Sequence, residues 1–194
     1  MPAITSLCVF CGSRPGGDPR YIESARTLGR LLAESGVRLV FGGGRAGMMG
    51  ALADAALGAG GAVTGVIPGH LMRAEHGHTG VDELLVVETM HARKQKMFEI
   101  SDAFAVLPGG IGTLDETFEI VTWKQLALHD KPVVIVDVGG YWRGFNGLIA
   151  QMTEDGFCAP ATRRLYAVAD GPEAVLPTIA RLPAPALPDA PGRL

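Results

Sequence analysis

Short apolar runs alternate with longer amphipathic stretches along most of the chain. The runs rich in β-branched and other apolar residues predict strands at 6–11, 37–43, 62–68, 84–89, 103–108, 132–138 and 165–170. The stretches between them repeat apolar or small residues at three- to four-residue spacing, and they predict helices at 21–36, 47–60, 90–101, 112–129, 145–155 and 172–182.

The order of these elements predicts the class of fold. Strands that are continuous apolar runs, separated by helices, are typical of a parallel sheet with both faces covered. We therefore expect a Rossmann-like, doubly wound α/β domain with a mostly parallel sheet of about seven strands. Residues 1–182 are expected to form this single domain, and the Pro/Ala-rich segment 183–194 is expected to be a disordered tail.

Composition and charge exclude several classes of protein. The 194 residues are 47% hydrophobic and 19% charged, which fits a compact domain, and the net charge of −3 gives no electrostatic footprint for nucleic acid or an anionic membrane. No apolar run approaches the roughly 20 residues of a membrane span, and the start "MPAITSLCVFCGS" does not look like a signal peptide. An odd number of cysteines, three, favours a reducing cytoplasm.

Two short patterns suggest metal or redox chemistry, but neither is complete. Cys8 and Cys11 form a C-x-x-C inside a predicted buried strand, without a second pair for a zinc site. His76 and His78 have metal-like spacing, without an evident third ligand. We expect packing roles for the cysteines and no metal at either pattern.

Three glycine-bearing turns follow predicted strands: "CGSRPGG", "FGGGRAGMMG" and "LPGGIGT". Ligands of open α/β sheets bind beyond the carboxyl ends of the strands, and glycines let backbone amides approach an anion at a helix N-terminus. This pattern predicts a phosphate site, with contacts from Ser13, Gly43, Gly44 and Gly109. The spacings of a dinucleotide-binding G-x-G-x-x-G and of a P-loop are absent, which disfavours a dehydrogenase and a P-loop NTPase.

Charged residues stand close to this predicted site. Asp115 and Glu116 follow the third turn, where they either serve the ligand or only complement the helix dipole, and Thr113 is expected to cap the helix or to form another hydrogen bond. Arg93 interrupts an apolar helical stripe of Met90, Met97 and Ile100, so it needs an anionic partner unless it reaches solvent. Lys94 and Lys96 are expected on other faces of that helix.

The motifs "PGGIGTLDE" and "MHARK", with "CGS" and "GGGRAGMMG", closely resemble the LOG family of cytokinin riboside 5′-monophosphate phosphoribohydrolases, often mislabelled lysine decarboxylases. The resemblance covers roughly residues 5–180. It implies hydrolysis of the N-glycosidic bond of N6-substituted AMP, with Arg93 and Glu116 as the catalytic pair. It also implies that no metal or organic cofactor is needed and that the protein forms a dimer or larger oligomer. The substrate contacts that it implies are Glu75, Arg93, Lys94, Gly110, Ile111, Gly112, Thr113, Leu114, Asp115, Glu116 and Thr122.

The implied chemistry suits these residue types. Cleavage builds oxocarbenium-like charge on the ribose, which a carboxylate at Glu116 stabilises while it orients or deprotonates water. Arg93 is expected either to lower the pKa of Glu116 or to hold the sugar. Lys94 and Lys96 lack the surroundings of a pyridoxal phosphate site, so we reject the decarboxylase label.

Two questions stay open in the sequence. The alternatives to a cytokinin-specific enzyme are a broader AMP nucleosidase and a non-catalytic nucleotide carrier of the same fold; the N6 pocket is expected near 47–50 and a loop at 70–80. Thr122 lies about 120° around the helix from Glu116, so we expect it to serve the site of a partner subunit, with the 112–129 helix near the interface of a homodimer.

Overall fold

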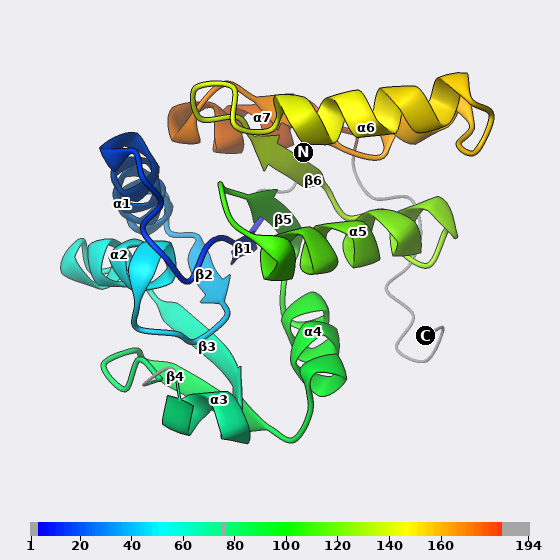
Figure 1. Ribbon diagram of the computed structural model, residues 1–194. Helices are drawn as coiled ribbons and strands as arrows, with labels where there is room; N and C mark the ends of the chain where they lie inside the picture. The colour runs from blue at the N-terminus through cyan, green and yellow to red at the C-terminus, as the bar shows by residue number, and fades with distance from the viewer. Residues whose placement is uncertain (1–3, 75–76, 184–194) are drawn as a thin grey trace.

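The computed structural model describes residues 4–74 and 77–183 of the chain. Its strands form one sheet in which every neighbouring pair is parallel, in the order β4-β3-β2-β1-β5-β6-β7 (Figure 1). The strands are β1 (Ser6–Phe10), β2 (Arg38–Phe41), β3 (Val63–Pro68), β4 (Glu83–Val87), β5 (Ala103–Val106), β6 (Val133–Val136) and β7 (Ala167–Ala169). The predicted α/β fold with about seven parallel strands is confirmed.

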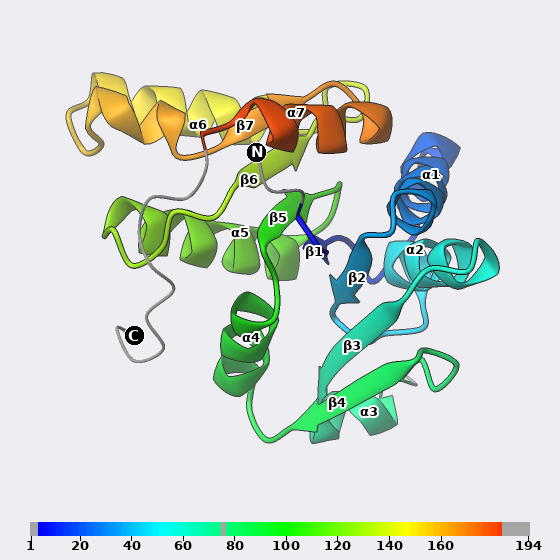
Figure 2. The same ribbon diagram turned by 180° about the vertical axis from the view of Figure 1, so that it is seen from behind.

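Helices cover both faces of this sheet (Figure 2). On one face lie α1 (Pro19–Glu34), α2 (Gly47–Gly58) and α7 (Val175–Arg181); on the other lie α4 (Met90–Glu99), α5 (Ile111–Gln125) and α6 (Arg143–Glu154). The shorter helices are α3 (Gly69–Ala74) and the 3₁₀ turns η1 (Pro160–Arg164) and η2 (Pro172–Ala174).

Strand β1 shows why its apolar residues run without interruption. Leu7 and Val9 point into the core beneath α1 and α2, whereas Cys8 and Phe10 point into the core beneath α4, α5 and α6. Because alternate residues of a strand face opposite sides of the sheet, a strand that is buried on both sides needs apolar residues at every position.

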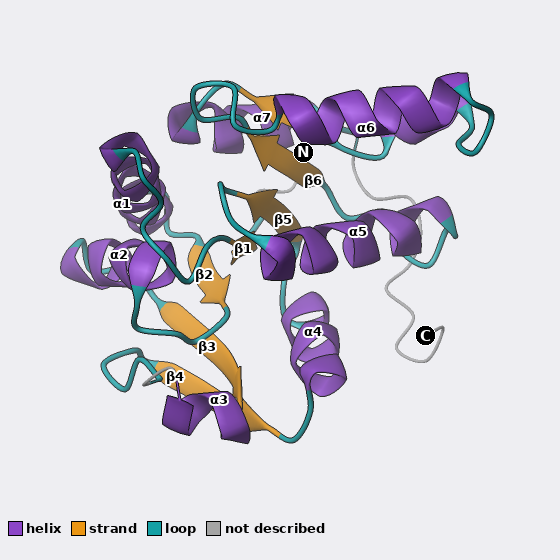
Figure 3. Ribbon diagram, in the orientation of Figure 1, coloured by secondary structure: helices purple, strands orange, loops and turns teal. Residues whose placement is uncertain are grey.

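The order of the strands places a ligand site beside β1. The chain leaves β1 toward β2 on one side and returns to β5 on the other, so the turns after β1 and β5 diverge at the carboxyl edge of the sheet. This is the switch point at which open α/β sheets bind ligands. The loop from β5 to α5 lies beside the loop from β1 to α1 (Figure 3), and the Gly12 amide donates to the Pro108 carbonyl at 3.0 Å.

Several predicted boundaries were wrong. Helix α1 begins at Pro19 rather than residue 21, because the Asp18 side chain accepts from the Arg20 amide and caps the helix. Helix α5 ends at Gln125 rather than residue 129, because Ala127 takes a positive φ of 55°. The imidazole of His129 instead folds back to the Ile120 carbonyl, at 2.9 Å.

The segment predicted as a loop at 70–80 contains helix α3, which the sequence pattern missed. The predicted tail lies outside the described residues from 184 onward. In the described part of the chain, none of the helices has the length and apolar character needed to cross a bilayer.

Candidate active site

The three glycine-bearing turns are joined by backbone contacts. Besides the Gly12–Pro108 bond, the Met48 amide donates to the Gly12 carbonyl at 3.1 Å. Gly47 has a φ of 61°, and a Cβ there would lie 2.4 Å from the Ser13 carbonyl oxygen. The turn after β1 therefore lies between the other two, and the three turns converge at one edge of the sheet, as the sequence predicts.

The turn after β5 exposes backbone amides. Gly109 is packed so tightly that a Cβ would lie 2.1 Å from Thr113 Oγ1 and 2.9 Å from the Gly12 nitrogen. The N-cap of α5 is Gly110, so no side chain caps this helix and Thr113 does not do so. Among the described residues no protein acceptor binds the N–H groups of Gly110, Ile111, Gly112 and Thr113. Four free donors at a helix N-terminus suit an anion.

Arg93 and Glu116 form a buried ion pair next to this turn. Arg93 Nη1 lies 2.9 Å from Glu116 Oε1, and the two side chains are only 10% and 8% exposed. The guanidinium also donates to the carbonyls of Val66, from Nε at 3.1 Å, and Gly42, from Nη2 at 3.4 Å. Arg93 is thus held by the ends of β2 and β3 and by α5, and it does not reach solvent.

Gly42 makes room for this arginine. A Cβ at Gly42 would lie 2.0 Å from Arg93 Nη2, so a larger residue would displace the guanidinium. The sequence pattern did not single out Gly42, because nothing in the sequence shows which glycine of the turn lies against Arg93.

The pKa of Glu116 is raised from 4.5 to about 7. Burial is the largest cause; Arg93 and Lys94 lower the pKa, while Asp115 and Glu119 raise it. The expectation that Arg93 lowers the pKa of Glu116 holds for that one contribution, but it is wrong for the net value because desolvation prevails.

Lys94 is buried as well. It lies about 100° around α4 from Arg93, on another face as expected, but α5 covers that face. Its ammonium lies 3.1 Å from both Asp115 Oδ2 and Glu119 Oε2. Burial acts to lower the pKa of Lys94, but hydrogen bonds to these two carboxylates, and their charges, raise it overall. Lys96 lies at the surface, 3.9 Å from Glu99.

The predicted contact residues in the turns after β1 and β2 differ in their exposure to solvent. Ser13 is exposed and its backbone lies against Gly47, whereas Gly43 and Gly44 are buried. The Gly43 carbonyl accepts from the His78 amide at 2.8 Å, and Gly44 forms an isolated antiparallel bridge with Gly77. Part of this turn therefore holds the chain segment after α3.

The remaining predicted contacts lie on α5, except one. Asp115 and Thr122 are exposed, Leu114 is half-buried, and Ile111 is 86% exposed. Glu75 lies outside the described residues.

The two patterns considered for metal or redox chemistry resolve differently. Cys8 and Cys11 are buried free thiols, and burial raises the pKa of both. His78 is buried and its Nε2 lies 2.8 Å from Asp54 Oδ1, while His76 lies outside the described residues. Within the described part of the chain no group of three potential metal ligands gathers.

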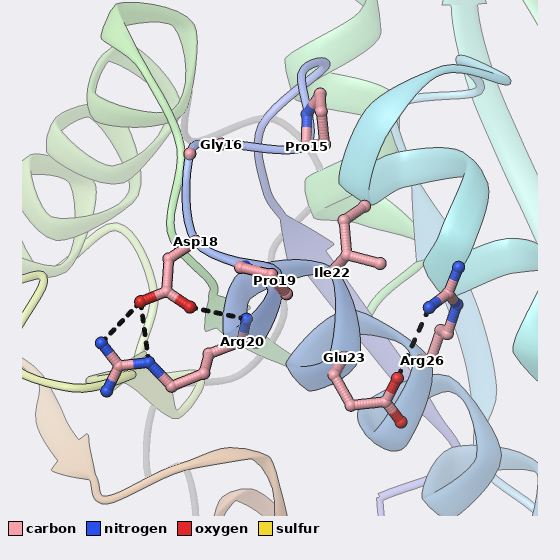
Figure 4. A pocket seen from close by; sticks show the side chains of 9 residues that line it. Pro15, Gly16, Asp18, Pro19, Arg20, Ile22, Glu23 and Arg26 are labelled. Carbon is pink, nitrogen blue, oxygen red and sulfur yellow. Dashed lines mark hydrogen bonds and ion pairs between the residues drawn. The ribbon is translucent and has the colours of Figure 1, made fainter.

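A cavity of about 610 Å³ lies at the start of α1, lined by Pro15, Gly16, Gly17, Asp18, Pro19, Arg20, Ile22, Glu23 and Arg26 (Figure 4). Its charged side chains pair with one another, Arg20 with Asp18 at 2.6 Å and Arg26 with Glu23 at 3.5 Å. Arg93 and Glu116 do not line this cavity, so we assign it no part in the site.

Known proteins resemble this chain in sequence and in fold. Residues 49–179 match the family described as "Possible lysine decarboxylase". A cytokinin riboside 5′-monophosphate phosphoribohydrolase of Rhodococcoides fascians is 47% identical over 163 residues, which are 84% of this chain and 82% of that protein. One from Arabidopsis thaliana is 43% identical over 159 residues, 82% of this chain and 75% of that protein.

A solved structure shares the fold at lower identity. The molybdenum cofactor binding protein of Rippkaea orientalis has a TM-score of 0.68 and 22% identity, covering 93% of this chain and 98% of its own. At that identity the likeness concerns the fold alone.

Proposed function

This chain belongs to the LOG family of cytokinin riboside 5′-monophosphate phosphoribohydrolases, and we propose that it hydrolyses the N-glycosidic bond of N6-substituted adenosine 5′-monophosphates. The products are the free base and ribose 5-phosphate. The observation that carries this proposal is the buried ion pair between Arg93 of α4 and Glu116 of α5, because the N-terminus of α5 also carries the free amides of the β5 turn.

The phosphate binds at the N-terminus of α5. Its negative charge accepts hydrogen bonds from the free amides of residues 110–113 and interacts favourably with the helix dipole. Glu116 lies five positions after Ile111, so their Cα atoms lie about 7–8 Å apart along the helix axis. Ribose 5-phosphate bridges a span of this order, which brings the anomeric carbon to Glu116.

Glu116 acts on the ribose. As the bond to the base breaks, positive charge develops on the sugar, and the ionised carboxylate stabilises it and accepts a proton from the attacking water. Arg93 keeps the carboxylate in place, because its guanidinium is itself fixed by two main-chain carbonyls. Burial removes competing water and strengthens both interactions.

The state of Lys94 argues against decarboxylation through a Schiff base. A lysine that forms such an adduct needs a neutral amine, and therefore a lowered pKa. The pKa of Lys94 is raised instead, and its ammonium is bound by two carboxylates. Lys94 thus serves to hold α4 against α5 and to support the charge of Glu116.

The working form of the enzyme is a cytoplasmic homodimer with α5 near its interface. Thr122 is exposed on α5 and lies away from Glu116, which supports a role in the partner's site. The exposed Leu126, 62% accessible at the end of this helix, extends the same surface. Buried Cys8 and Cys11 and partly exposed Cys158 are all free thiols, which suits a reducing compartment.

The test is incubation with isopentenyladenosine 5′-monophosphate, AMP and isopentenyladenosine, with base and ribose 5-phosphate separated by chromatography. We expect rapid release from the first, slower release from AMP, and little from the nucleoside, which lacks the phosphate. Equal rates for the first two would favour the broader AMP nucleosidase. Tight binding without release of either product would show a carrier and refute the proposal.

A further inference from the structure

Tyr141 lies in the loop between β6 and α6 and reaches the β5 turn. Its hydroxyl donates a hydrogen bond to the Gly109 carbonyl. The ring packs edge-on against Tyr21, with centroids 5.3 Å apart, and against Trp142, with centroids 4.9 Å apart. Tyr21 of α1 and the neighbouring Trp142 therefore fix the position of this hydroxyl.

The bond to Gly109 sets the direction of the next amide. The peptide between Gly109 and Gly110 is trans, so its C=O and N–H point in opposite directions. Holding the carbonyl toward Tyr141 turns the Gly110 N–H away from Tyr141. That N–H is one of the donors for which the described residues supply no acceptor.

This peptide is free to flip without such a restraint. Glycine on both sides tolerates either sign of φ, and a flip would reverse the φ of Gly110, now −95°. The flipped peptide would present its carbonyl oxygen where the amide donor stood. An oxygen at that position repels a phosphate and removes a hydrogen bond.

We propose that Tyr141 is a positioning residue for phosphate binding, which holds the Gly109–Gly110 peptide in its donor orientation. This inference rests on the proposed function, because it takes the β5 turn as the phosphate site. If part of the protein holds this peptide in the flipped orientation, the apparent affinity for every phosphate-bearing ligand falls in proportion to the fraction that remains unflipped. The Arg93–Glu116 pair is not affected.

The experiment compares wild type with Tyr141→Phe, which keeps the ring and removes only the hydroxyl. With isopentenyladenosine 5′-monophosphate we expect KM to rise about 3- to 10-fold, because one hydrogen bond is lost. We expect kcat to stay within about twofold of wild type. Inhibition by ribose 5-phosphate should weaken by the same factor, and inhibition by the free base should not change. Tyr166→Phe is the matched control, since it loses one hydroxyl bond to Asn146 Oδ1 (3.0 Å).

Gly110→Ala supplies an independent check. A Cβ at Gly110 meets no described atom within 4 Å, and alanine accepts the present φ but resists the positive φ of the flipped peptide. Measured within the Gly110→Ala background, the effect of Tyr141→Phe on KM should therefore shrink toward none.

Two results would overturn the inference while the enzyme remains active. One is an unchanged KM in Tyr141→Phe; the other is a fall in kcat with unchanged inhibition by ribose 5-phosphate. An inactive wild type would instead refute the proposed function.

Discussion

The raised pKa of Glu116 predicts how the activity depends on pH. If Glu116 acts as a carboxylate, the rate of hydrolysis follows its ionised fraction, so the rate rises with pH through about 7. A carboxyl with its ordinary pKa of 4.5 would already be ionised near pH 7, so the rate of hydrolysis would not change with pH there.

The structure gives the size of the effect. The change from 4.5 to about 7 corresponds to about 3 kcal/mol in favour of the neutral acid, mostly from burial. With this pKa, about one tenth of Glu116 is ionised at pH 6 and about nine tenths at pH 8. We expect kcat/KM, which reports the ionisation of the free enzyme, to rise close to tenfold between these pH values.

Two variants separate Glu116 from the substrate phosphate, which titrates near pH 6. Asp115 raises and Lys94 lowers the pKa of Glu116. The midpoint of the rise should therefore move to lower pH in Asp115→Asn and to higher pH in Lys94→Met, whereas titration of the substrate is the same in all three enzymes. The assay is kcat/KM from pH 5 to 9. A flat profile, or a midpoint that moves in the same direction in both variants, would refute the reasoning.

Two further predictions concern the glycine turn and stability. Gly109→Ala should raise KM for the nucleotide at least about tenfold, because a Cβ there collides with Thr113 and Gly12. The control is Gly147→Ala in α6, which should leave KM unchanged because no described atom lies within 4 Å of its Cβ. Equal KM values in the two variants would contradict this account. Between pH 4.5 and 7 the folded state keeps a proton on Glu116 that the unfolded state releases, so Glu116 makes the free energy of unfolding fall as pH rises through that window. Urea unfolding at pH 5 and pH 8 should show a smaller fall in Glu116→Gln than in wild type, and an equal fall would count against the raised pKa.

The sequence was sufficient to predict the structure where a residue type can be accommodated in only one kind of environment. Uninterrupted apolar strands such as β1 require cover on both faces, and an arginine on an apolar stripe requires a buried anion; Arg93 indeed meets Glu116. The glycine turns converge as predicted, because parallel strands end at one edge of the sheet.

The sequence was insufficient where the outcome depends on contacts between distant segments. Lys94 is buried because α4 packs against both the sheet and α5, so two adjacent positions of one helix face protein. The net pKa of Glu116 depends on how much solvent is lost, which no spacing of charges gives. Tyr141 follows two glycines after β6, and nothing in that pattern indicates that its hydroxyl reaches Gly109.

The central claim is that a carboxylate beside a phosphate-binding turn cleaves the ribosyl bond. The most direct test measures release of base from isopentenyladenosine 5′-monophosphate at pH 8 by wild type and by Glu116→Ala, with circular dichroism to check folding. The account predicts equimolar base and ribose 5-phosphate from wild type and a rate at least ~10²-fold lower in the folded variant. A folded Glu116→Ala protein with a rate near that of wild type would contradict it.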